Sequence, residues 1–238
     1  MGRTHLLFGR NVFEEALRVK APILEVYAEN PSAKDFAESL MRQARLPLNI
    51  VRPHLPKEVK EQSHQGLAFR TDFDFRISEG ALNSENFPRI LFANHIEDVQ
   101  NFGAIIRSAA AFGFTLIAHE NKRSAALNAA AVKTSAGLAF RVKFLEVANL
   151  SYLARSLIKD GYQVAALENR EEAVELYDWQ PLSPLVVVMG SESDGVSKPL
   201  LELADPCVRI PLVEGVDSLN VAQAASVALS WAHCQLEK

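Results

Sequence analysis

The residues after Pro88 form short apolar runs of strand length, and helical stretches separate several of them. The runs read RILFAN, FTLIAHE, GYQVAALE and PLVVVMGSE. The stretch LVVVM (residues 185–189) is apolar at every position, which is typical of a central strand buried on both faces of a parallel sheet. Strands that alternate with helices predict an α/β fold with a largely parallel sheet.

The sequence also predicts how the chain divides. Residues 1–73 alternate strand-like and helical pieces and predict a small α/β domain. Residues 74–88 have no apolar period and predict a linker, which leaves residues 89–238 for the larger domain. From about Leu219 the sequence is rich in alanine and apolar around much of its girth, so we expect a last helix buried in the domain or at a subunit interface.

Composition excludes several classes of protein. The chain has 238 residues, 48% of them hydrophobic and 23% charged, which is typical of a globular rather than a disordered protein. It has no run of 18 apolar residues and its N-terminus lacks a signal-peptide pattern, so we expect a cytoplasmic protein without a membrane partner. Cys207 and Cys234 suit a reduced cytosol and are too few for a zinc site, so we expect no metal.

The charge of the chain is uneven along its length. The net charge of −4 does not by itself indicate a nucleic-acid binder. Residues 1–77 carry 12 Lys and Arg against 10 Asp and Glu, whereas the rest of the chain is acidic. Inside that acidic part, residues 121–145 contain no acid and the bases Lys122, Arg123, Lys133, Arg141 and Lys143. This segment is either a phosphate-binding patch or an ordinary solvated face.

Three predicted strand ends carry unusual residues, and ligands of open α/β sheets bind at the carboxyl ends of strands. The first segment, NFGAIIRSAAAFGF (residues 101–114), predicts a buried helix with Arg107 in its middle. A buried guanidinium needs a polar partner. Because helical side chains lean toward the N-terminus, Arg107 would lean over Gly103 toward Asn101. The alternative is that Asn101 caps the helix and Arg107 packs against a neighbour.

The second and third segments are loops that follow apolar strands. In VVVMGSESDGVS, Gly190 and Gly195 bracket a polar turn with Glu192 at its apex. Glycines let a backbone approach a ligand closely, although a tight turn with a solvated acid has the same sequence. In RIPLVEGVDSLNVAQAA, a loop leads into the last helix, where Ser218 or Asn220 is a site residue or simply an N-cap. Motifs of phosphate loops, zinc proteases, dinucleotide-binding folds and acyl hydrolases are absent.

Together, the three segments resemble the motifs of the SpoU (TrmH-like) family of RNA ribose 2′-O-methyltransferases in the SPOUT superfamily. The motifs are Asn101-x5-Arg107, Gly190-Ser-Glu192 and Ser218-Leu-Asn220 after IPL, and the resemblance covers roughly residues 89–238. FGRNVFEEAL and HQGLAF resemble the small ribosomal-protein-like RNA-binding domain of many members. HQG (residues 64–66) is most similar to the branch that includes the RlmB-type 23S ribosomal RNA guanosine methyltransferase.

This resemblance implies a knotted fold. True knots are nearly absent from proteins, so general rules of chain topology would not have predicted it. A SPOUT domain threads its C-terminal segment into a deep trefoil knot that forms the S-adenosylmethionine pocket. The knot loops are then expected at residues 167–168, 190–195 and 210–220. The residues implied to bind the cofactor are Leu167, Gly190, Gly195, Ile210 and Leu219. Family members are dimers packed through the knotted region, so the resemblance also implies a homodimer.

The resemblance implies an in-line displacement in which a ribose 2′-oxygen attacks the methyl carbon of a sulfonium. The residues implied to act in catalysis are Arg107, Asn101, Glu192, Ser218 and Asn220. Family proposals include Arg107 as the general base. A guanidinium stays protonated, so clamping a phosphate and stabilising the developing alkoxide is physically easier. Two departures from the family pattern are Val99, where proline is common, and Ser193, at a glycine position.

The implied roles of the other residues are supporting ones. Asn101 would orient Arg107 or the ribose, Glu192 would pair with Arg107 or hold its loop, and Ser218 and Asn220 would fix the third loop. The expected activity is S-adenosylmethionine-dependent 2′-O-methylation of ribosomal RNA, at a 23S guanosine. Transfer RNA is the alternative substrate, and a member that binds RNA without transferring methyl groups is an alternative of another class.

Overall fold

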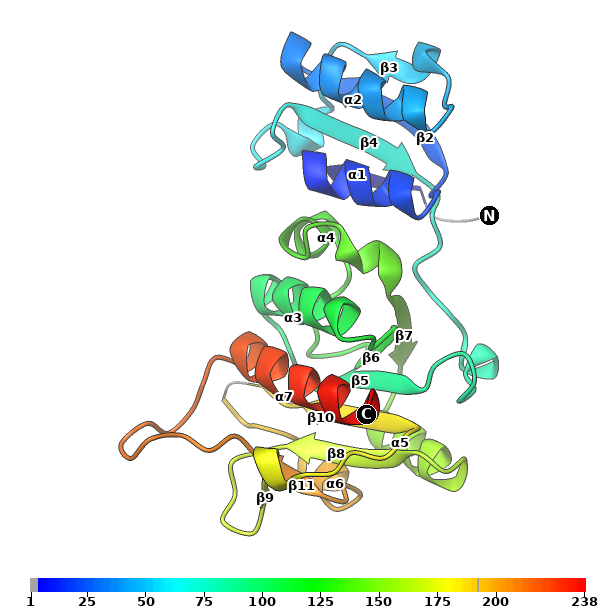
Figure 1. Cartoon of the computed structure of the whole chain (residues 1–238). Coiled ribbons are helices and arrows are strands. Elements are labelled where there is room, and N and C mark those ends of the chain that lie inside the picture. The colour runs from blue at the N-terminus through cyan, green and yellow to red at the C-terminus, as the bar shows by residue number, and fades with distance from the viewer. Residues whose placement is uncertain (1–3, 192) are drawn as a thin grey trace. The chain divides into compact units, whose positions relative to one another are not determined.

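The computed structural model describes residues 4–191 and 193–238. They form two compact units, each with a sheet of its own (Figure 1). The first unit comprises the chain up to Phe75 together with Leu127–Arg141. The second unit comprises Arg76–Ala126 and Val142–Lys238.

The first unit contains a four-stranded sheet in the order β1-β4-β2-β3. Its strands are β1 (His5–Phe8), β2 (Ile23–Ala28), β3 (Val51–Arg52) and β4 (Leu67–Thr71), with β4 antiparallel to both β1 and β2. Its helices are α1 (Arg10–Arg18) and α2 (Pro31–Gln43), with short 3₁₀ turns η1 (Leu48–Ile50) and η2 (Lys57–Val59). α1 buries Val12, Phe13 and Ala16, and the Phe13 ring meets that of Phe69 edge-on at 5.2 Å. Such a stripe of apolar residues holds a helix on a sheet.

A segment from the middle of the chain belongs to this first unit. It contains α4 (Ala129–Thr134) and η4 (Leu138–Arg141). The Lys133 ammonium donates to Gln65 Oε1 at 2.8 Å, and Arg141 Nε donates to a carboxylate oxygen of Glu15. The Phe140 ring lies 5.0 Å from that of Phe73. The domain predicted over residues 1–73 therefore omits part of the unit, because these contacts join residues far apart in the sequence.

The segment predicted as a linker, residues 74–88, also differs from expectation. Arg76 forms a bridge to Phe144, and the Tyr162 hydroxyl donates to the Phe87 carbonyl at 2.9 Å. Leu82 and Phe87 pack against the core of the second unit. Most of the segment is thus attached to the second unit. The sequence did not indicate this because the few apolar residues of the segment are spaced irregularly and carry no periodic signal.

The ion pair between Arg141 and Glu15 gives a prediction about stability. The Glu15 side chain is only 6% exposed while that of Arg141 is 49% exposed. Removing the arginine leaves a buried carboxylate without its main partner, so we expect Arg141→Ala to lower the free energy of unfolding by about 1–3 kcal/mol. Arg42→Ala, which breaks an exposed pair with Glu38 on α2, should cost less than about 0.5 kcal/mol. Urea denaturation measures both, and equal effects would contradict this account of the segment.

The second unit contains a seven-stranded sheet in the order β7-β6-β5-β10-β8-β11-β9. All pairings between its described strands are parallel. The strands are β5 (Arg89–Ala93), β6 (Leu116–Glu120), β7 (Lys143–Val147), β8 (Gln163–Leu167), β9 (Val174–Glu175), β10 (Leu185–Met189) and β11 (Cys207–Arg209). The predicted parallel sheet is confirmed, and LVVVM is β10, buried at every position in the middle of the sheet. β7 escapes prediction because KFLEV has polar residues at two of its positions.

Helices cover both faces of this sheet. On one face, α5 (Leu150–Lys159) and α6 (Lys198–Leu201) bury Leu153, Leu157 and Leu200 against strand residues such as Phe92 and Val188. The other helices are α3 (Val99–Ala111) and α7 (Val221–Leu236), with short turns η3 (Glu79–Ala81) and η5 (Leu176–Asp178). α7 packs against both α3 and β10. The last helix predicted from about Leu219 is therefore α7, and it is buried along one side.

The order of the strands determines where a ligand can bind. The chain builds β5, β6 and β7 toward one edge and then crosses to β8 on the other side of β5. The direction in which successive strands are added to the sheet therefore reverses between β5 and β10. Ligands of open α/β sheets bind at such a switch point. Residues 210–220 extend from the sheet as a long loop before α7 (Figure 1). The trefoil knot expected from these loops remains a prediction.

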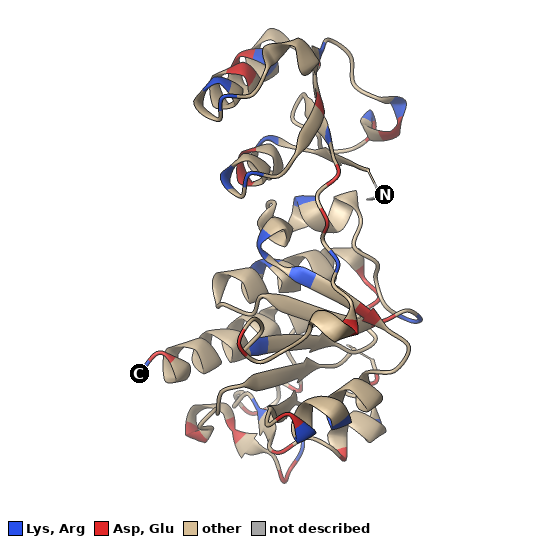
Figure 2. Cartoon of the chain, turned by 90° about the vertical axis from the view of Figure 1, so that its right-hand side faces the viewer, with Lys and Arg blue, Asp and Glu red and all other residues tan. Residues whose placement is uncertain are grey.

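Residues of both charges are spread along the described chain in both units. Figure 2 shows Lys and Arg interspersed with Asp and Glu along the described ribbon of both units. The candidate site is therefore located from cavities and side-chain geometry rather than from charge.

Within the part of the chain that the structure describes, none of the helices has the length and apolar character needed to cross a membrane.

Candidate functional site

A cavity of about 480 Å³ lies at the carboxyl ends of β8 and β10. All the residues that the resemblance implies for the cofactor line it: Leu167, Gly190, Gly195, Ile210 and Leu219. Ser218 and Asn220 of the third segment line it as well. The second and third segments, which are far apart in the sequence, therefore meet around one cavity at the carboxyl edge of the sheet.

Two glycines shape the wall of this cavity. Ser191 and Gly195 exchange two backbone hydrogen bonds of 3.1 Å, which close the turn that follows β10. A Cβ on Gly190 would lie 2.1 Å from the Gly195 carbonyl carbon and 2.2 Å from the Val196 nitrogen. Gly195 has φ +66, a region that residues with a side chain rarely adopt. The turn thus requires glycine at both positions.

Glu168 lies in the first of the expected knot loops, although it was not among the residues implied to bind the cofactor, and it fixes the turn from the neighbouring strand. Its Oε2 accepts a hydrogen bond of 2.7 Å from the Val196 nitrogen. A Cβ on Gly195 would come within 2.6 Å of the same carboxylate. The signal that could have found Glu168 is its place directly after β8, where a polar residue follows a buried run.

The third segment is joined to the first by a pair of asparagines. Asn220 Oδ1 accepts hydrogen bonds from the backbone of α7 at Ala222 and Gln223, so Asn220 is the N-cap of that helix. Its Nδ2 donates to Asn101 Oδ1 at 3.0 Å. Asn220 is therefore the N-cap of α7, and the same side-chain amide also holds Asn101.

The start of α3 corrects one of the alternatives for Asn101. The helix begins at Val99, and Asp98 is its N-cap, accepting a hydrogen bond of 2.7 Å from the Asn101 nitrogen. Asn101 therefore lies within the first turn and does not cap the helix. Val99 occupies the first helical position, where proline is favoured but not required.

A second cavity, of about 290 Å³, lies beside the first. Its lining includes Asn101 and Asp98 from the first segment, and Arg123 from the basic segment. Ser191, Ser193, Asp194 and Val221 line both cavities. The two cavities are thus separated only by the turn after β10 and the start of α7, which suits a site for two molecules that react with each other.

Arg107 is exposed, so the expectation of a buried guanidinium was wrong. α3 buries Phe102, Ile105, Ile106 and Ala109, which form one stripe at helical spacing and leave Arg107 on another side. Arg107 makes no hydrogen bond or ion pair within residues 4–191 and 193–238, and it lines neither cavity. Glu192 lies outside the described residues, so its implied role remains a prediction.

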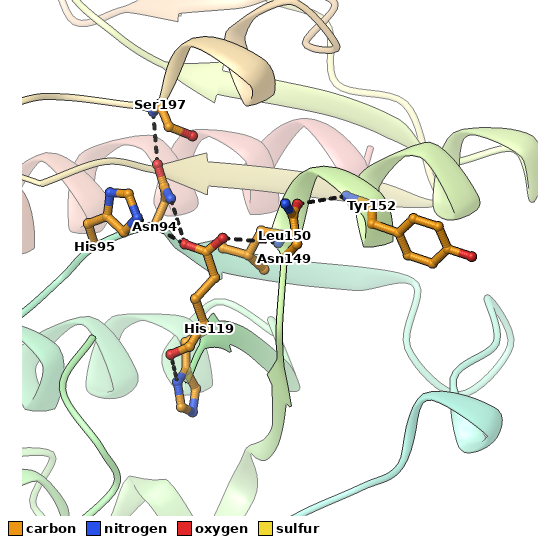
Figure 3. A network of polar contacts seen from close by, with 8 residues as sticks. Asn94, His95, His119, Asn149, Leu150, Tyr152 and Ser197 are labelled. Carbon is orange, nitrogen blue, oxygen red and sulfur yellow. Dashed lines mark hydrogen bonds and ion pairs between the residues drawn. The ribbon is translucent and has the colours of Figure 1, made fainter. Parts of the chain in front are cut away.

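A polar network at the ends of β5 and β6 was also missed by the sequence analysis (Figure 3). Asn94, which is only 1% exposed, accepts from the Ser197 nitrogen at 2.8 Å and donates to Glu120 Oε2 at 3.3 Å. Glu120 Oε1 accepts from the Leu150 nitrogen at 3.3 Å, and His95 Nε2 lies 3.0 Å from Glu120 Oε2. Both RILFANH and FTLIAHE end in polar residues, which is the sequence signal for this network.

The model of the SpoU rRNA methylase family matches residues 88–230 of the chain. The chain belongs to this family. This SpoU family member is 32% identical over 237 residues to a protein of Mycobacterium sp. (strain KMS) described as an uncharacterized tRNA/rRNA methyltransferase. That match covers 95% of this chain and 75% of the relative. Family membership inferred from the three motifs is confirmed.

Solved structures of the family share the fold over nearly the whole chain. One, described as an RNA 2′-O ribose methyltransferase, has a TM-score of 0.79 at 22% identity and covers 100% of this chain and 90% of its own. An AdoMet-bound rRNA methyltransferase from Sinorhizobium meliloti has a TM-score of 0.77 at 21% identity, covering 98% and 88%. Because these structures cover nearly the whole chain, they share the fold of both units of this SpoU family member.

Proposed function

We propose that this protein transfers the methyl group of S-adenosylmethionine to a ribose 2′-oxygen of RNA, with ribosomal RNA as the substrate. The observation that carries the proposal is the meeting of three motif segments at one edge of the sheet. Two of them line the larger cavity, and Asn220 joins them to Asn101 of the first. Membership of the SpoU family and the relative described as a tRNA/rRNA methyltransferase support it.

The larger cavity suits S-adenosylmethionine in size and chemistry. Its volume of about 480 Å³ lies within the range of small-molecule sites. Leu167, Ile210 and Leu219 offer apolar surface for the adenine, and the carboxylates of Glu168 and Asp217 suit a cationic ligand. Gly190 lets the backbone approach the ligand. The bound cofactor would supply an electrophilic methyl group on a sulfonium.

The side chains of the chain would supply positioning and charge. Asn101, held by Asn220, faces the smaller cavity and would orient the ribose there. Arg107 is exposed and therefore available to a phosphate of a bound RNA, where its permanent charge would stabilise the developing alkoxide. Glu192 and Ser218 would hold the two loops, as the family resemblance implies.

Ribosomal RNA is favoured over transfer RNA by the first unit. That unit is a complete α/β domain of its own rather than a short extension. The solved structure described as an rRNA methyltransferase covers 98% of the chain, and so includes a counterpart of this unit. A non-catalytic RNA binder is disfavoured because the five residues implied in catalysis are all present in the sequence.

We also propose a homodimer located in the cytoplasm. The loop before α7 exposes Val213 at 76% and Val216 at 45%. Leu182 and Tyr177 are exposed as well. These apolar side chains are available to a second chain, and the family resemblance implies a dimer packed near the third loop. Light scattering of the full chain should give twice the mass of 26.3 kDa, and a monomer at micromolar concentration would contradict the proposal.

Mapping 2′-O-methyl groups in the total RNA of a strain that lacks this protein tests the function. We expect one ribosomal position to lose its mark and to regain it when the gene is restored. Loss of a mark from transfer RNA instead would establish the alternative substrate. An unchanged map would contradict the proposal.

A further inference from the structure

His95 is held in an unusual conformation at the carboxyl end of β5. Its φ of 59° lies in the left-handed region, which only a few per cent of non-glycine residues adopt, although histidine is enriched there along with asparagine and aspartate. Such conformations persist where the surroundings impose them, and they cluster at functional sites. His95 lines the smaller cavity together with Asn101.

The carboxylate that faces His95 is fixed by other contacts. Glu120 ends the adjacent strand β6, and its side chain is 17% exposed. The Leu150 nitrogen donates to one of its oxygens, and Asn94 Nδ2 donates to the other, which is also the oxygen 3.0 Å from His95 Nε2. Asn94 is in turn held by the Ser197 nitrogen. Glu120 is therefore a rigid acceptor that orients the imidazole.

This arrangement selects one tautomer of the ring. The Glu120 carboxylate accepts a hydrogen bond from Nε2–H, so the neutral imidazole carries its lone pair on Nδ1. In Figure 3 one ring nitrogen of His95 faces the Glu120 contact and the other faces away from it. Nδ1 has no hydrogen-bond partner within the described parts of the chain. In serine-protease triads a carboxylate likewise orients the histidine that activates a hydroxyl nucleophile, but there it holds Nδ1 and Nε2 is the base, whereas here the two ring nitrogens exchange these roles.

The alternatives for a proton acceptor are weaker. Arg107 stays protonated and lines neither cavity. His119 is buried, which lowers its pKa below the ordinary value, and its Nδ1 contacts the Glu120 carbonyl instead of a cavity. Among the described residues that line the two cavities, His95 is the only imidazole.

We propose that His95, oriented by Glu120, is the general base that accepts the proton of the attacking ribose hydroxyl. In this step the 2′-oxygen forms a bond to the methyl carbon, and the sulfur–methyl bond breaks with its electron pair going to sulfur. The hydroxyl proton goes to Nδ1 of His95. The inference rests on the proposed methyl transfer to a ribose and assigns the proton to a residue other than the arginine of the first motif.

Other charged groups face the same cavity and bear on the pH dependence. They are Glu97 and Asp98 in the loop after β5, Arg123 after β6, and Asp194 in the turn after β10. The His95→Asn variant keeps all of these groups, so a change in its pH profile relative to the wild type reports on the imidazole.

The test compares kcat between about pH 5.5 and 8.5, with S-adenosylmethionine and ribosomal RNA from a strain that lacks the protein. The wild-type kcat should rise with pH as an imidazole loses its proton. His95→Asn, which tolerates a left-handed backbone, should lower kcat by about 100-fold or more and remove that rise, with little change in KM for S-adenosylmethionine. Glu120→Gln should lower kcat yet keep the rise, because the imidazole remains.

His233→Gln is the matched control, since His233 lies in the last turn of α7 in the second unit and lines neither cavity. It should leave kcat and its pH profile unchanged. A flat wild-type profile, or a His95→Asn variant that keeps both the rise and the wild-type kcat, overturns the inference while methyl transfer stands. A wild-type protein that transfers no methyl group to any RNA contradicts the proposed function itself.

Discussion

Gly190→Ala is expected to raise the Kd for S-adenosylmethionine by about 100-fold or more and to lower the free energy of unfolding by about 2–3 kcal/mol. The added methyl would lie 2.1 Å from the Gly195 carbonyl carbon and 2.2 Å from the Val196 nitrogen. Both atoms are backbone, so the turn after β10 has to move. That turn is a wall of both cavities.

Calorimetry with S-adenosylmethionine and urea denaturation measure the two effects of Gly190→Ala. Gly80→Ala is the matched control, because a Cβ at Gly80 meets no atom within 4 Å. The control should bind the cofactor as the wild type does. If Gly190→Ala binds S-adenosylmethionine with wild-type affinity, the larger cavity is not the cofactor site.

Arg107→Ala is expected to lower kcat/KM for methyl transfer by about 100-fold or more while leaving stability nearly unchanged. Arg107 is exposed and has no partner in the described chain, so its removal leaves none of the described groups unsatisfied. The loss would arise only when RNA is bound and negative charge develops on the ribose oxygen. Arg107→Lys should recover part of the activity, since an ammonium keeps the charge but not the planar fork.

Arg155→Ala provides the comparison for Arg107→Ala. Like Arg107, Arg155 is an exposed arginine that lines neither cavity, but it lies on α5, outside the three motif segments. Initial rates with ribosomal RNA should separate the two variants clearly. Near-normal transfer by Arg107→Ala would refute a central role for this arginine.

Much of the larger unit could be predicted from apolar runs. LVVVM indicated β10 because a short apolar run rich in valine is typical of a strand buried on both faces. The residues around the larger cavity were found through the family motifs, and spacing alone could not have brought Gly190 and Leu219 together. The order of the strands is what makes them neighbours, and no local pattern encodes that order.

The errors have physical causes that can be named. Arg107 was expected to be buried because its helix is mostly apolar, but the stripe of Phe102, Ile105 and Ala109 leaves that position facing outward. Residues 127–141 join the first unit through contacts such as Arg141 with Glu15, which are more than a hundred residues apart. His95 and Glu120 were missed since each is an isolated polar residue until two parallel strands place their ends side by side.

The central claim is that a methyl group passes from the cofactor to a ribose 2′-oxygen at the edge of this sheet. Incubating the protein with S-adenosylmethionine that carries a deuterated methyl group, and with ribosomal RNA from a strain lacking it, tests this claim most directly. Mass spectrometry of the digested nucleosides should find the label on the ribose of one nucleoside, and none with Gly190→Ala. Label on a nucleobase, or no label on any RNA, would contradict the claim.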